Sequence, residues 1–467
     1  VGLADTIQCI PRRRARGEAA MAAAQHISFA VRLEEPAATD AGAALTRALN
    51  ADGATVERTS ETRYVVACAL PDASEAAALR NRVLSGDYDR RASAALGVAA
   101  RADRTAFAEA YEAARCGSGE TLTPHQREAL EACAAGVDVH LKAPAGSGKT
   151  LWALHRLVNE LRGDAGLAVF VARNRALACF AAKWVLARGL LARLRVLVEP
   201  FAAGVLAPRA RGGRLVLEAP DDGDGVAYRL VVVDEAHHVY GDDALRAAVE
   251  ALVAPTTRRL LLSDVSQCRS RHVFYPAIAA EARLTEVVRC SKRIVAGAMA
   301  FQLGGEQKLL TTCAHDDAGP PLKSFLFDAS GDRFGDYAAR VRDALGHVES
   351  QFPGLGLDDR VALVVPDEPF RAALEGALAG DAFALVDAAT AACRLERTSD
   401  KPWLVLDTVD HMDGLERLVV VCVGLDAKID DGSAVVARRS LPVSSDGRGS
   451  FRRARFARNR EVIRRAR

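Results

Sequence analysis

Residues 143–150 read Ala-Pro-Ala-Gly-Ser-Gly-Lys-Thr, and regular structure is expected on both sides of them. Residues 137–142 alternate between apolar and polar side chains, which predicts a strand. Apolar residues at helical spacing follow Lys149, namely Leu154, Leu157, Val158 and Leu161. A strand, a glycine-rich loop and a helix in this order are typical of a P-loop, which binds nucleotide phosphates.

The composition of the loop follows from this chemistry. Gly146 and Gly148 let successive backbone N–H groups face the phosphates without clashes of Cβ atoms. Lys149 would neutralise the β- and γ-phosphates of ATP, and the Thr150 hydroxyl would hold Mg²⁺. The expected nucleotide contacts are Ala145, Gly146, Ser147, Gly148, Lys149 and Thr150. The motif usually begins with glycine where this chain has Ala143, and a glycine-rich turn with an exposed lysine is the alternative.

A second acidic element completes the expected site. Residues 230–233 are an apolar run typical of a parallel strand buried on both faces, and Asp234 and Glu235 follow it at the edge where such sheets bind ligands. We assign Asp234 to Mg²⁺ and Glu235 to the general base that activates water. His237 and His238 either couple the site to a partner domain or lie in a solvated loop. Zinc is a poor fit, because further ligands at metal-binding spacing are missing nearby.

The length and charge of the chain indicate how many domains it has and which partners it can bind. The chain has 467 residues, half of them apolar, which is enough for roughly three domains with large cores. A net charge of +2 excludes a generic polyanion binder. Residues 438–467 contain eleven arginines and only two acidic residues. This segment either contacts phosphates or forms a solvated tail.

Ten scattered cysteines without a Cys-x-x-Cys pair argue against a disulfide framework and a zinc ribbon. We expect reduced, mostly buried thiols in an intracellular protein of the nucleus or cytoplasm. No apolar stretch reaches transmembrane length, so no membrane partner is expected. Because the chain begins with Val1, the natural start is expected upstream or at Met21.

The N-terminal part has a different pattern. Residues 1–25 are expected to be disordered, with a basic targeting segment as the alternative. Residues 26–92 predict a small βαββα module, half of a ferredoxin-like fold, and residues 93–120 a helical linker. Because the module shows no catalytic constellation, its expected role is to dock a protein partner.

Five further segments resemble superfamily 1 helicases. In chain order they are Leu122–Gln126, Val169–Asn174, Leu260–Gln267, Leu284–Ser291 and Thr408–Glu416, similar to the glutamine motif and to motifs Ia, III, IV and V. With the P-loop and Asp234-Glu235 they stand in the order of the helicase family, of the UvrD/Rep type. The segments at 284–291 and 408–416 look closest to the helicase-like module of Schlafen-type proteins. The Schlafen nuclease-like module is not recognisable, so ribonuclease activity is not implied.

The resemblance implies an α/β fold with two RecA-like P-loop NTPase lobes, residues 121–283 and 284–467, each with a parallel sheet. It also implies roles for individual residues. Gln126 would recognise adenine, Gln267 would sense the γ-phosphate, and Arg289 would reach that phosphate from the second lobe. Nucleotide contacts would also come from Gly414 and Glu416. Single-stranded DNA or RNA would be contacted by Arg173, Asn174 and Thr408.

Two departures limit the resemblance, and one aromatic residue has two possible roles. The aromatic and Thr-Arg-Ala-like tripeptide of motif VI is replaced by residues 451–459, where Arg458 is the candidate second arginine finger and Arg453 the alternate. Asp413 occupies a motif V position often held by lysine, which weakens an expected phosphate contact. Trp184, in a chain that is only 5% aromatic, either stacks on a base or belongs to the core.

Two functions remain open. The first is an ATP-dependent helicase, translocase or nucleic-acid remodeller that hydrolyses ATP on a single strand. The short spacing between motifs leaves little room for inserted subdomains, so stepping or clamping is expected more than duplex separation. The second is a nucleotide-dependent signalling switch or scaffold with a helicase-like ATPase core. The sequence does not distinguish DNA from RNA.

Overall fold

The computed structural model describes residues 25–37, 40–49, 54–71, 73–105, 122–133, 136–163, 166–221, 226–264, 267, 273–299, 312–314, 318–327, 331–358, 360–395 and 401–424. The chain divides into two compact units, Val1–Ala102 and Asp103–Arg467. The predicted disordered start before residue 25 and the arginine-rich end lie outside the described residues. Within the described ranges, no helix is both long and apolar enough to cross a membrane.

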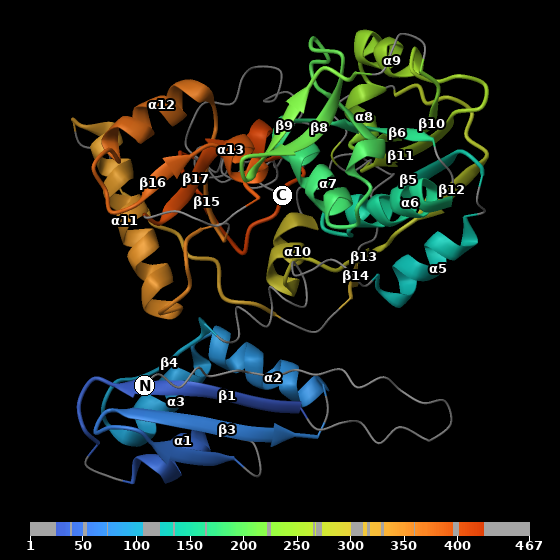
Figure 1. The fold of residues 1–467 in the computed structure, drawn as a ribbon. Coiled ribbons are helices and arrows are strands. Elements are labelled where there is room, and N and C mark those ends of the chain that lie inside the picture. The colour runs from blue at the N-terminus through green and yellow to red at the C-terminus, as the bar shows by residue number, and fades with distance from the viewer. Residues whose placement is uncertain are drawn as a thin grey trace, which may run out of the picture. The chain divides into compact units, whose positions relative to one another are not determined.

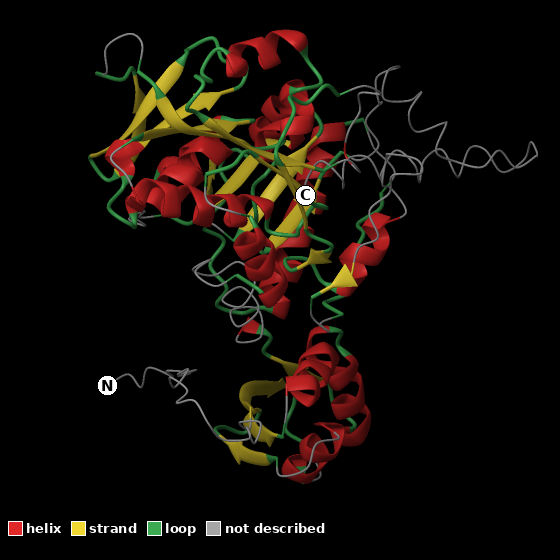
Figure 2. Ribbon diagram, turned by 90° about the vertical axis from the view of Figure 1, so that its right-hand side faces the viewer, coloured by secondary structure: helices red, strands yellow, loops and turns green. Residues whose placement is uncertain are grey.

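The first unit is a four-stranded antiparallel sheet with helices on one face (Figures 1 and 2). Its strands lie in the order β2-β3-β1-β4. Along the chain its elements are β1 (Gln25–Leu33), α1 (Ala41–Leu49), β2 (Thr55–Arg58), β3 (Arg63–Leu70), α2 (Ala73–Leu84), α3 (Asp87–Leu96) and β4 (Ala100–Ala102). The strands and helices predicted for 26–83 are therefore observed. The unit continues through β4, ten residues beyond the boundary expected at residue 92.

Alternation along the strands builds the core of this unit. In β3 every second side chain, from Tyr64 to Leu70, is buried, and Phe29 of β1 points to the same core. Phe29 meets Tyr88 of α3 edge to face, with ring centroids 5.3 Å apart. Period-two burial on one face is the pattern expected of an antiparallel sheet covered on one side.

The first lobe of the second unit holds an eight-stranded sheet in the order β12-β5-β11-β10-β6-β7-β8-β9. The six strands from β12 to β7 are parallel, and the hairpin β8-β9 extends the sheet in antiparallel pairing. The strands are β5 (Val139–Lys142), β6 (Leu167–Ala172), β7 (Leu194–Val198), β8 (Val205–Arg211), β9 (Arg214–Glu218), β10 (Tyr228–Val233), β11 (Arg258–Ser263) and β12 (Ala280–Arg283).

Both faces of this sheet are covered. Leu230 and Val232 of β10 join the core formed with α6 (Lys149–Gly163) and α7 (Arg175–Leu186). Val231 and Val233 join the opposite core, which includes residues of α8 (Ala236–Val239) and α9 (Asp243–Glu250). The continuous apolar run of β10 is thus explained by burial on both sides.

The second lobe has a smaller parallel sheet in the order β16-β17-β15-β18. The elements of this lobe are β13 (Glu286–Val287), α10 (Lys292–Met299), β14 (Thr312–Cys313), α11 (Arg333–Gln351), β15 (Val361–Val365), α12 (Glu368–Ala377), β16 (Ala384–Val386), α13 (Ala388–Cys393), β17 (Trp403–Thr408), α14 (Val409–Met412) and β18 (Val419–Cys422). The predicted α/β architecture is confirmed, but only the second-lobe sheet is purely parallel, because the β8-β9 hairpin makes the first-lobe sheet mixed.

The expectation of only reduced thiols is wrong for one pair. Cys179 of α7 and Cys393 of α13 form a disulfide, although 214 positions separate them in the sequence. Sequence spacing could not reveal this pairing, because it depends on how the two lobes pack. Among the described cysteines, Cys68, Cys133 and Cys290 are free thiols.

Candidate nucleotide-binding site

The loop at residues 143–148 lies at the carboxyl end of β5 and leads into α6. Its first residue is tied to the neighbouring strand by the bond from the Ala143 N–H to the Ser263 carbonyl, 3.0 Å. Gly146 and Gly148 have φ angles of 76° and 81°, in the left-handed region that favours glycine. A Cβ on Gly148 would lie 2.5 Å from Gln126 Nε2, so the conformation favours glycine there and a larger residue would displace the Gln126 side chain.

Lys149 is a buried cation facing buried carboxylates. Its side chain is 7% exposed, and its Nζ lies 3.9 Å from Glu235 Oε1. Burial opposes the charged form, but the carboxylates of Glu235, Asp264 and Asp234 outweigh it and raise the pKa of Lys149. The ammonium group therefore stays charged at neutral pH, as phosphate neutralisation requires.

Thr150 and Asp234 bring two oxygen ligands together. The Thr150 hydroxyl donates a 2.8 Å hydrogen bond to Asp234 Oδ2. Burial and the neighbouring charge of Glu235 raise the pKa of Asp234 to about 6. A hydroxyl and a buried carboxylate in one place suit Mg²⁺, a hard cation that also relieves the cost of burying the charge.

Glu235 has the strained backbone often found at functional sites. Its φ and ψ are 49° and 45°, in the left-handed region although it is not glycine. Its Oε2 is buried and has no hydrogen-bond partner among the described residues. A water molecule or a phosphate-bound group is the kind of partner that such an acceptor needs. The geometry therefore fits the predicted general base.

His237 is buried against this carboxylate, which excludes the solvated-loop interpretation for it. Its Nδ1 accepts the Asp264 N–H at 3.3 Å and lies 3.4 Å from Glu235 Oε2. Burial and the charges of Lys149 and Arg173 lower the pKa of His237 to about 3, so the ring is neutral. His237 thus connects the end of β10 to the end of β11.

Gln126 braces the P-loop. It lies in α5 (Pro124–Ala132), where its side chain and that of Thr123 form a capping box. Its Nε2 donates to the Ser147 carbonyl at 2.7 Å and its Oε1 accepts the Thr123 N–H at 2.9 Å. Both ends of the amide are engaged inside the chain, and its adenine contact stays a prediction.

Residues of the second lobe meet the P-loop directly. The N–H groups of Val288 and Arg289 both donate to the Gly146 carbonyl, at 3.0 and 3.1 Å. The Arg289 guanidinium forms an ion pair with Glu416. Gly414 has φ 79°, and a Cβ there would lie 3.0 Å from Leu177 of the first lobe. The structure thus brings Arg289, Gly414 and Glu416 to one lobe junction.

Two residues expected to hold a nucleic-acid strand, Arg173 and Asn174, also lie at this junction. Arg173 forms 2.7 Å bonds to both carboxylate oxygens of Glu199 and lies 3.6 Å from Asp413. Asn174 caps α7 and donates from Nδ2 to the Asp413 carbonyl at 2.8 Å. Burial and the charge of Glu235 raise the pKa of Asp413 to about 7, whereas Arg173 lowers it. Contacts within the chain therefore occupy these polar groups.

Three other predicted site residues make contacts within their own lobes. Thr408 is buried and caps α14 through the His411 N–H, 3.3 Å. Trp184 packs against the first-lobe core, with the Arg188 guanidinium 3.3 Å from its ring centroid, which disfavours base stacking. Gln267 is half-buried and its N–H donates to the Asp264 carbonyl. Arg458 and Arg453 lie outside the described residues.

One further group of possible metal ligands was not predicted. Donor atoms of Glu368, Asp407 and His411 lie within 4.8 Å of one another. Asp407, however, already accepts the N–H groups of Thr408 and Ala388 at 2.8 Å, and Arg371 pairs with Glu368 at 2.7 Å. These bonds describe an ion-pair network that fixes the start of α14.

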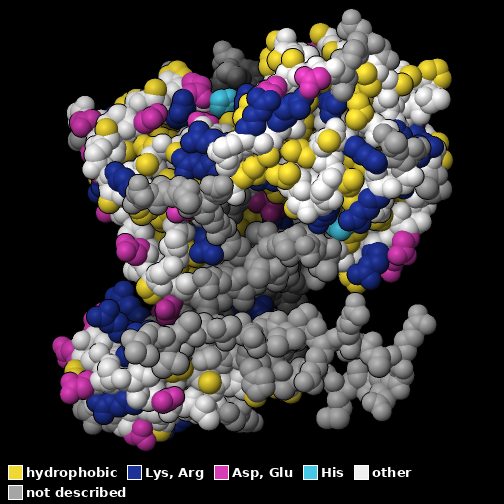
Figure 3. Space-filling view, viewed as in Figure 1, with side chains coloured by type: hydrophobic (Ala, Val, Ile, Leu, Met, Phe, Trp, Pro, Cys, Tyr) yellow, Lys and Arg dark blue, Asp and Glu magenta, His cyan; other side chains and the backbone are white. Residues whose placement is uncertain are grey.

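On the face drawn in Figure 3, Lys and Arg side chains are interspersed with Asp and Glu. This distribution agrees with the small net charge of the whole chain. A nucleic-acid interface on this face would have to use local contacts rather than one broad basic field.

Comparisons with known proteins agree with a helicase-like nucleotide site. The family described as DEAD/DEAH box helicase matches residues 123–197, which include the P-loop. A search of the curated proteins gives no match. The matched segment supports a helicase-like P-loop NTPase lobe in this chain.

Solved structures with some likeness include the Pif1 helicase from Candida albicans (13% identity, 38% of this chain, 43% of that chain, TM-score 0.24). The HK97 bacteriophage large terminase is 15% identical over 50% of this chain and 50% of its own, with a TM-score of 0.26. S. tokodaii Xpd4 is 10% identical over 68% of this chain and 84% of its own, with a TM-score of 0.28. The aligned parts cover half or less of the Pif1 and terminase chains.

Proposed function

We propose that this chain is an ATP hydrolase of superfamily 1 helicase type that moves along or remodels single-stranded nucleic acid. The observation that carries the proposal is the convergence of Lys149, Thr150, Asp234 and Glu235 at the carboxyl edge of one parallel sheet. A cation, a metal-ligand pair and a carboxylate with one oxygen free of hydrogen bonds are the groups that phosphoryl transfer to water requires.

The chain's own groups would act as follows. Backbone N–H groups of residues 145–150 cradle the phosphates, and Lys149 neutralises their charge. Mg²⁺, held by Thr150 and Asp234, would supply positive charge at the phosphate oxygens. Glu235 orients the attacking water and accepts its proton. Arg289, now paired with Glu416, would turn to the γ-phosphate.

The remaining finger and sensor residues complete this proposal. We assign the second finger to Arg458, with Arg453 as the alternate, and the γ-phosphate sensor to Gln267. Gln126 acts on the nucleotide through the Ser147 carbonyl, in addition to the adenine contact that the resemblance implies. Within superfamily 1, we retain the Schlafen-type resemblance of the segments at 284–291 and 408–416.

Strand binding is proposed at the junction of Arg173, Asn174 and Thr408. Because Asn174 and Asp413 join the lobes there, a bound strand would have to displace or rearrange these contacts. Such an exchange would couple strand binding to closure of the lobes around ATP.

A nucleotide-dependent switch or scaffold is the second candidate. One observation favours it: Glu199 and Asp413 neutralise Arg173, so the expected phosphate contact is already occupied. The first unit, with its βαββααβ order, would then serve as a ferredoxin-like module that docks a protein partner inside the cell, in the nucleus or cytoplasm.

The test is ATP turnover by the purified chain at fixed salt, with and without poly(dT) or poly(U). The motor predicts strong stimulation by one of the two polymers, and thereby identifies DNA or RNA. Turnover that depends on Lys149 but ignores both polymers would favour the switch. Glu199→Gln frees Arg173 from one carboxylate and should strengthen polymer binding only if the strand contacts Arg173.

A further inference from the structure

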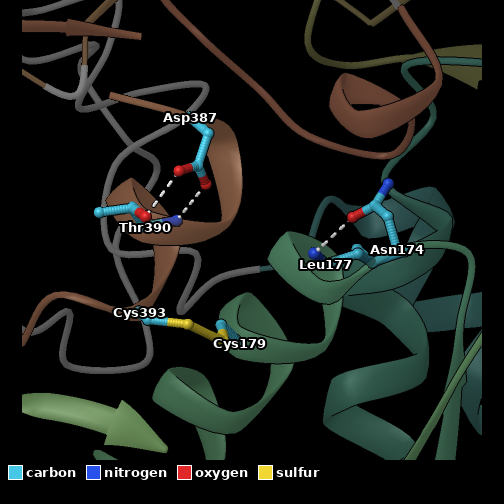
Figure 4. Close-up of a disulfide and its surroundings, with 6 residues drawn as sticks. All are labelled: Asn174, Leu177, Cys179, Asp387, Thr390 and Cys393. Atoms are coloured by element: carbon cyan, nitrogen blue, oxygen red, sulfur yellow. Dashed lines mark hydrogen bonds between the residues drawn. A yellow bond between two sulfur atoms is a disulfide. The ribbon is translucent and has the colours of Figure 1, made fainter. Parts of the chain in front are cut away.

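The disulfide between Cys179 and Cys393 joins the two lobes covalently. Cys179 lies in α7, whose N-cap is Asn174, and Cys393 is the last residue of α13 in the second lobe (Figure 4). Their Cα atoms are 5.4 Å apart, within the usual range for a disulfide. A bond across a contact between lobes restrains relative motion more directly than one within a lobe.

The surrounding contacts show that this is a packed part of the junction. The Leu395 N–H donates to the Gly213 carbonyl at 2.8 Å, in the turn of the β8-β9 hairpin. Arg394 forms a β-bridge with Arg214 of the same hairpin. Ala176 of α7 is buried in the core of the second lobe. The end of α13 is thus fastened to the first lobe by noncovalent contacts as well.

Both sulfur-bearing residues are shielded. Cys179 is fully buried and Cys393 is 8% exposed, and both belong to the apolar core around α6 and α7. A soluble thiol or disulfide can reach them only when α7 and α13 separate transiently. The exchange of this bond is therefore linked to opening of the junction.

We propose that Cys179 and Cys393 are a reversible redox site whose oxidation ties the lobes together and slows ATP turnover. The reactant would be a low-molecular-weight disulfide such as glutathione disulfide. The Cys393 thiolate attacks it and releases one glutathione thiolate, giving a mixed disulfide. The Cys179 thiolate then attacks the Cys393 sulfur and releases the second, each cysteine having lost its proton to water. Two glutathione thiols reverse the reaction.

The first test needs no enzymatic activity. The full chain is equilibrated in glutathione buffers of rising oxidised fraction, alkylated in acid-quenched aliquots, digested without reduction and analysed by mass spectrometry. A linked Cys179–Cys393 peptide should appear and disappear reversibly. It should be absent from Cys179→Ala and Cys393→Ala but kept in Cys133→Ala, a matched control whose free thiol is buried in the same core. Separate alkylation of both cysteines in every buffer would overturn the proposal.

The second test measures how much the disulfide between the lobes stabilises the chain. Oxidation should raise the unfolding temperature of wild type and Cys133→Ala by roughly 5 °C and leave Cys179→Ala unchanged. An equal shift in Cys179→Ala would overturn the proposal, because another site would then be responsible.

The expected effect of oxidation on ATP turnover rests on the proposed function. Oxidation should slow ATP turnover of wild type by about threefold or more, but not that of Cys179→Ala. A loss that persists in Cys179→Ala would place the sensitivity elsewhere, for instance at Cys290 beside the P-loop, and would overturn the proposal. If the reduced chain hydrolyses no ATP, the proposed function fails, while the peptide and unfolding measurements still decide the redox site.

Discussion

The Thr150 hydroxyl and Asp234 Oδ2 are joined by a 2.8 Å hydrogen bond, although 84 positions separate them in the sequence. The bond connects the first turn of α6 to the residue that follows β10. It holds two oxygen ligands at the point where nucleotide phosphates would meet the sheet edge. Without Mg²⁺, the ionised carboxylate of Asp234 is buried unfavourably and lowers the stability of the chain.

Asp234→Asn should stabilise the nucleotide-free chain. The pKa of Asp234 is raised from its ordinary 3.8 to about 6, so the ionised carboxylate lowers stability as pH rises from about 4 through about 6. Above about pH 6 the ionised Asp234 lowers the free energy of unfolding by its full amount, on the order of 1–3 kcal/mol. Urea unfolding at pH 7.5 should show the variant as more stable, with the difference shrinking toward pH 4. Equal stability at pH 7.5 would contradict the assignment of a buried charge.

Gln126→Ala should weaken binding of GTP as well as ATP, because the lost hydrogen bond to the Ser147 carbonyl does not depend on the base. Loss of one such buried bond corresponds to about 1 kcal/mol, or roughly fivefold in affinity. Titration with fluorescent analogues of both nucleotides measures it, and Thr123→Ala, which removes the capping partner, is the control. A loss confined to ATP would instead establish adenine recognition.

Asn174→Asp should selectively weaken the contact between the lobes. The new carboxylate can still accept the Leu177 N–H that caps α7, but it cannot donate to the Asp413 carbonyl. Polymer-stimulated ATP turnover should fall several-fold while turnover without polymer changes little. Asp367→Asn, which alters the cap of α12, is the matched control. Unchanged stimulation would remove Asn174 from the coupling.

Arg289→Ala should lower the catalytic rate far more than ATP affinity, by about 10³-fold if it acts as a finger. The reason is that charge on the transferred phosphoryl group develops mainly in the transition state. Single-turnover hydrolysis and equilibrium binding separate the two effects. Arg283→Ala, an exposed arginine paired with Glu281, serves as the control. A variant that loses binding and rate equally would show a ground-state role.

Much of the site could be predicted from local sequence. The helix expected from Lys149 begins at that residue, and the strand before Asp234 ends at Val233. Such elements depend on local periodicity and on glycine conformation, which the sequence displays directly. The placement of Glu235 at the sheet edge follows from the same rule.

Other features depend on contacts between distant segments. The Gln126 brace, the Arg173–Asp413 pair and the Cys179–Cys393 bond each join residues that only the packing of the chain brings together. The three-residue strand β4 lacks the length that a periodic pattern needs. The sequence therefore indicates which residues bind the nucleotide, but not which contacts hold the two lobes together.

The most direct measurement is steady-state ATP turnover of the wild-type chain beside Lys149→Ala and Glu235→Gln, with nucleotide binding measured on the same samples. Removing the general base should reduce turnover by about 10²-fold or more and leave ATP binding intact. Lys149→Ala should lose both, and Glu349→Gln, an exposed glutamate of α11, should lose neither. Undiminished turnover in Glu235→Gln, or turnover that survives in Lys149→Ala, would contradict hydrolysis at this site.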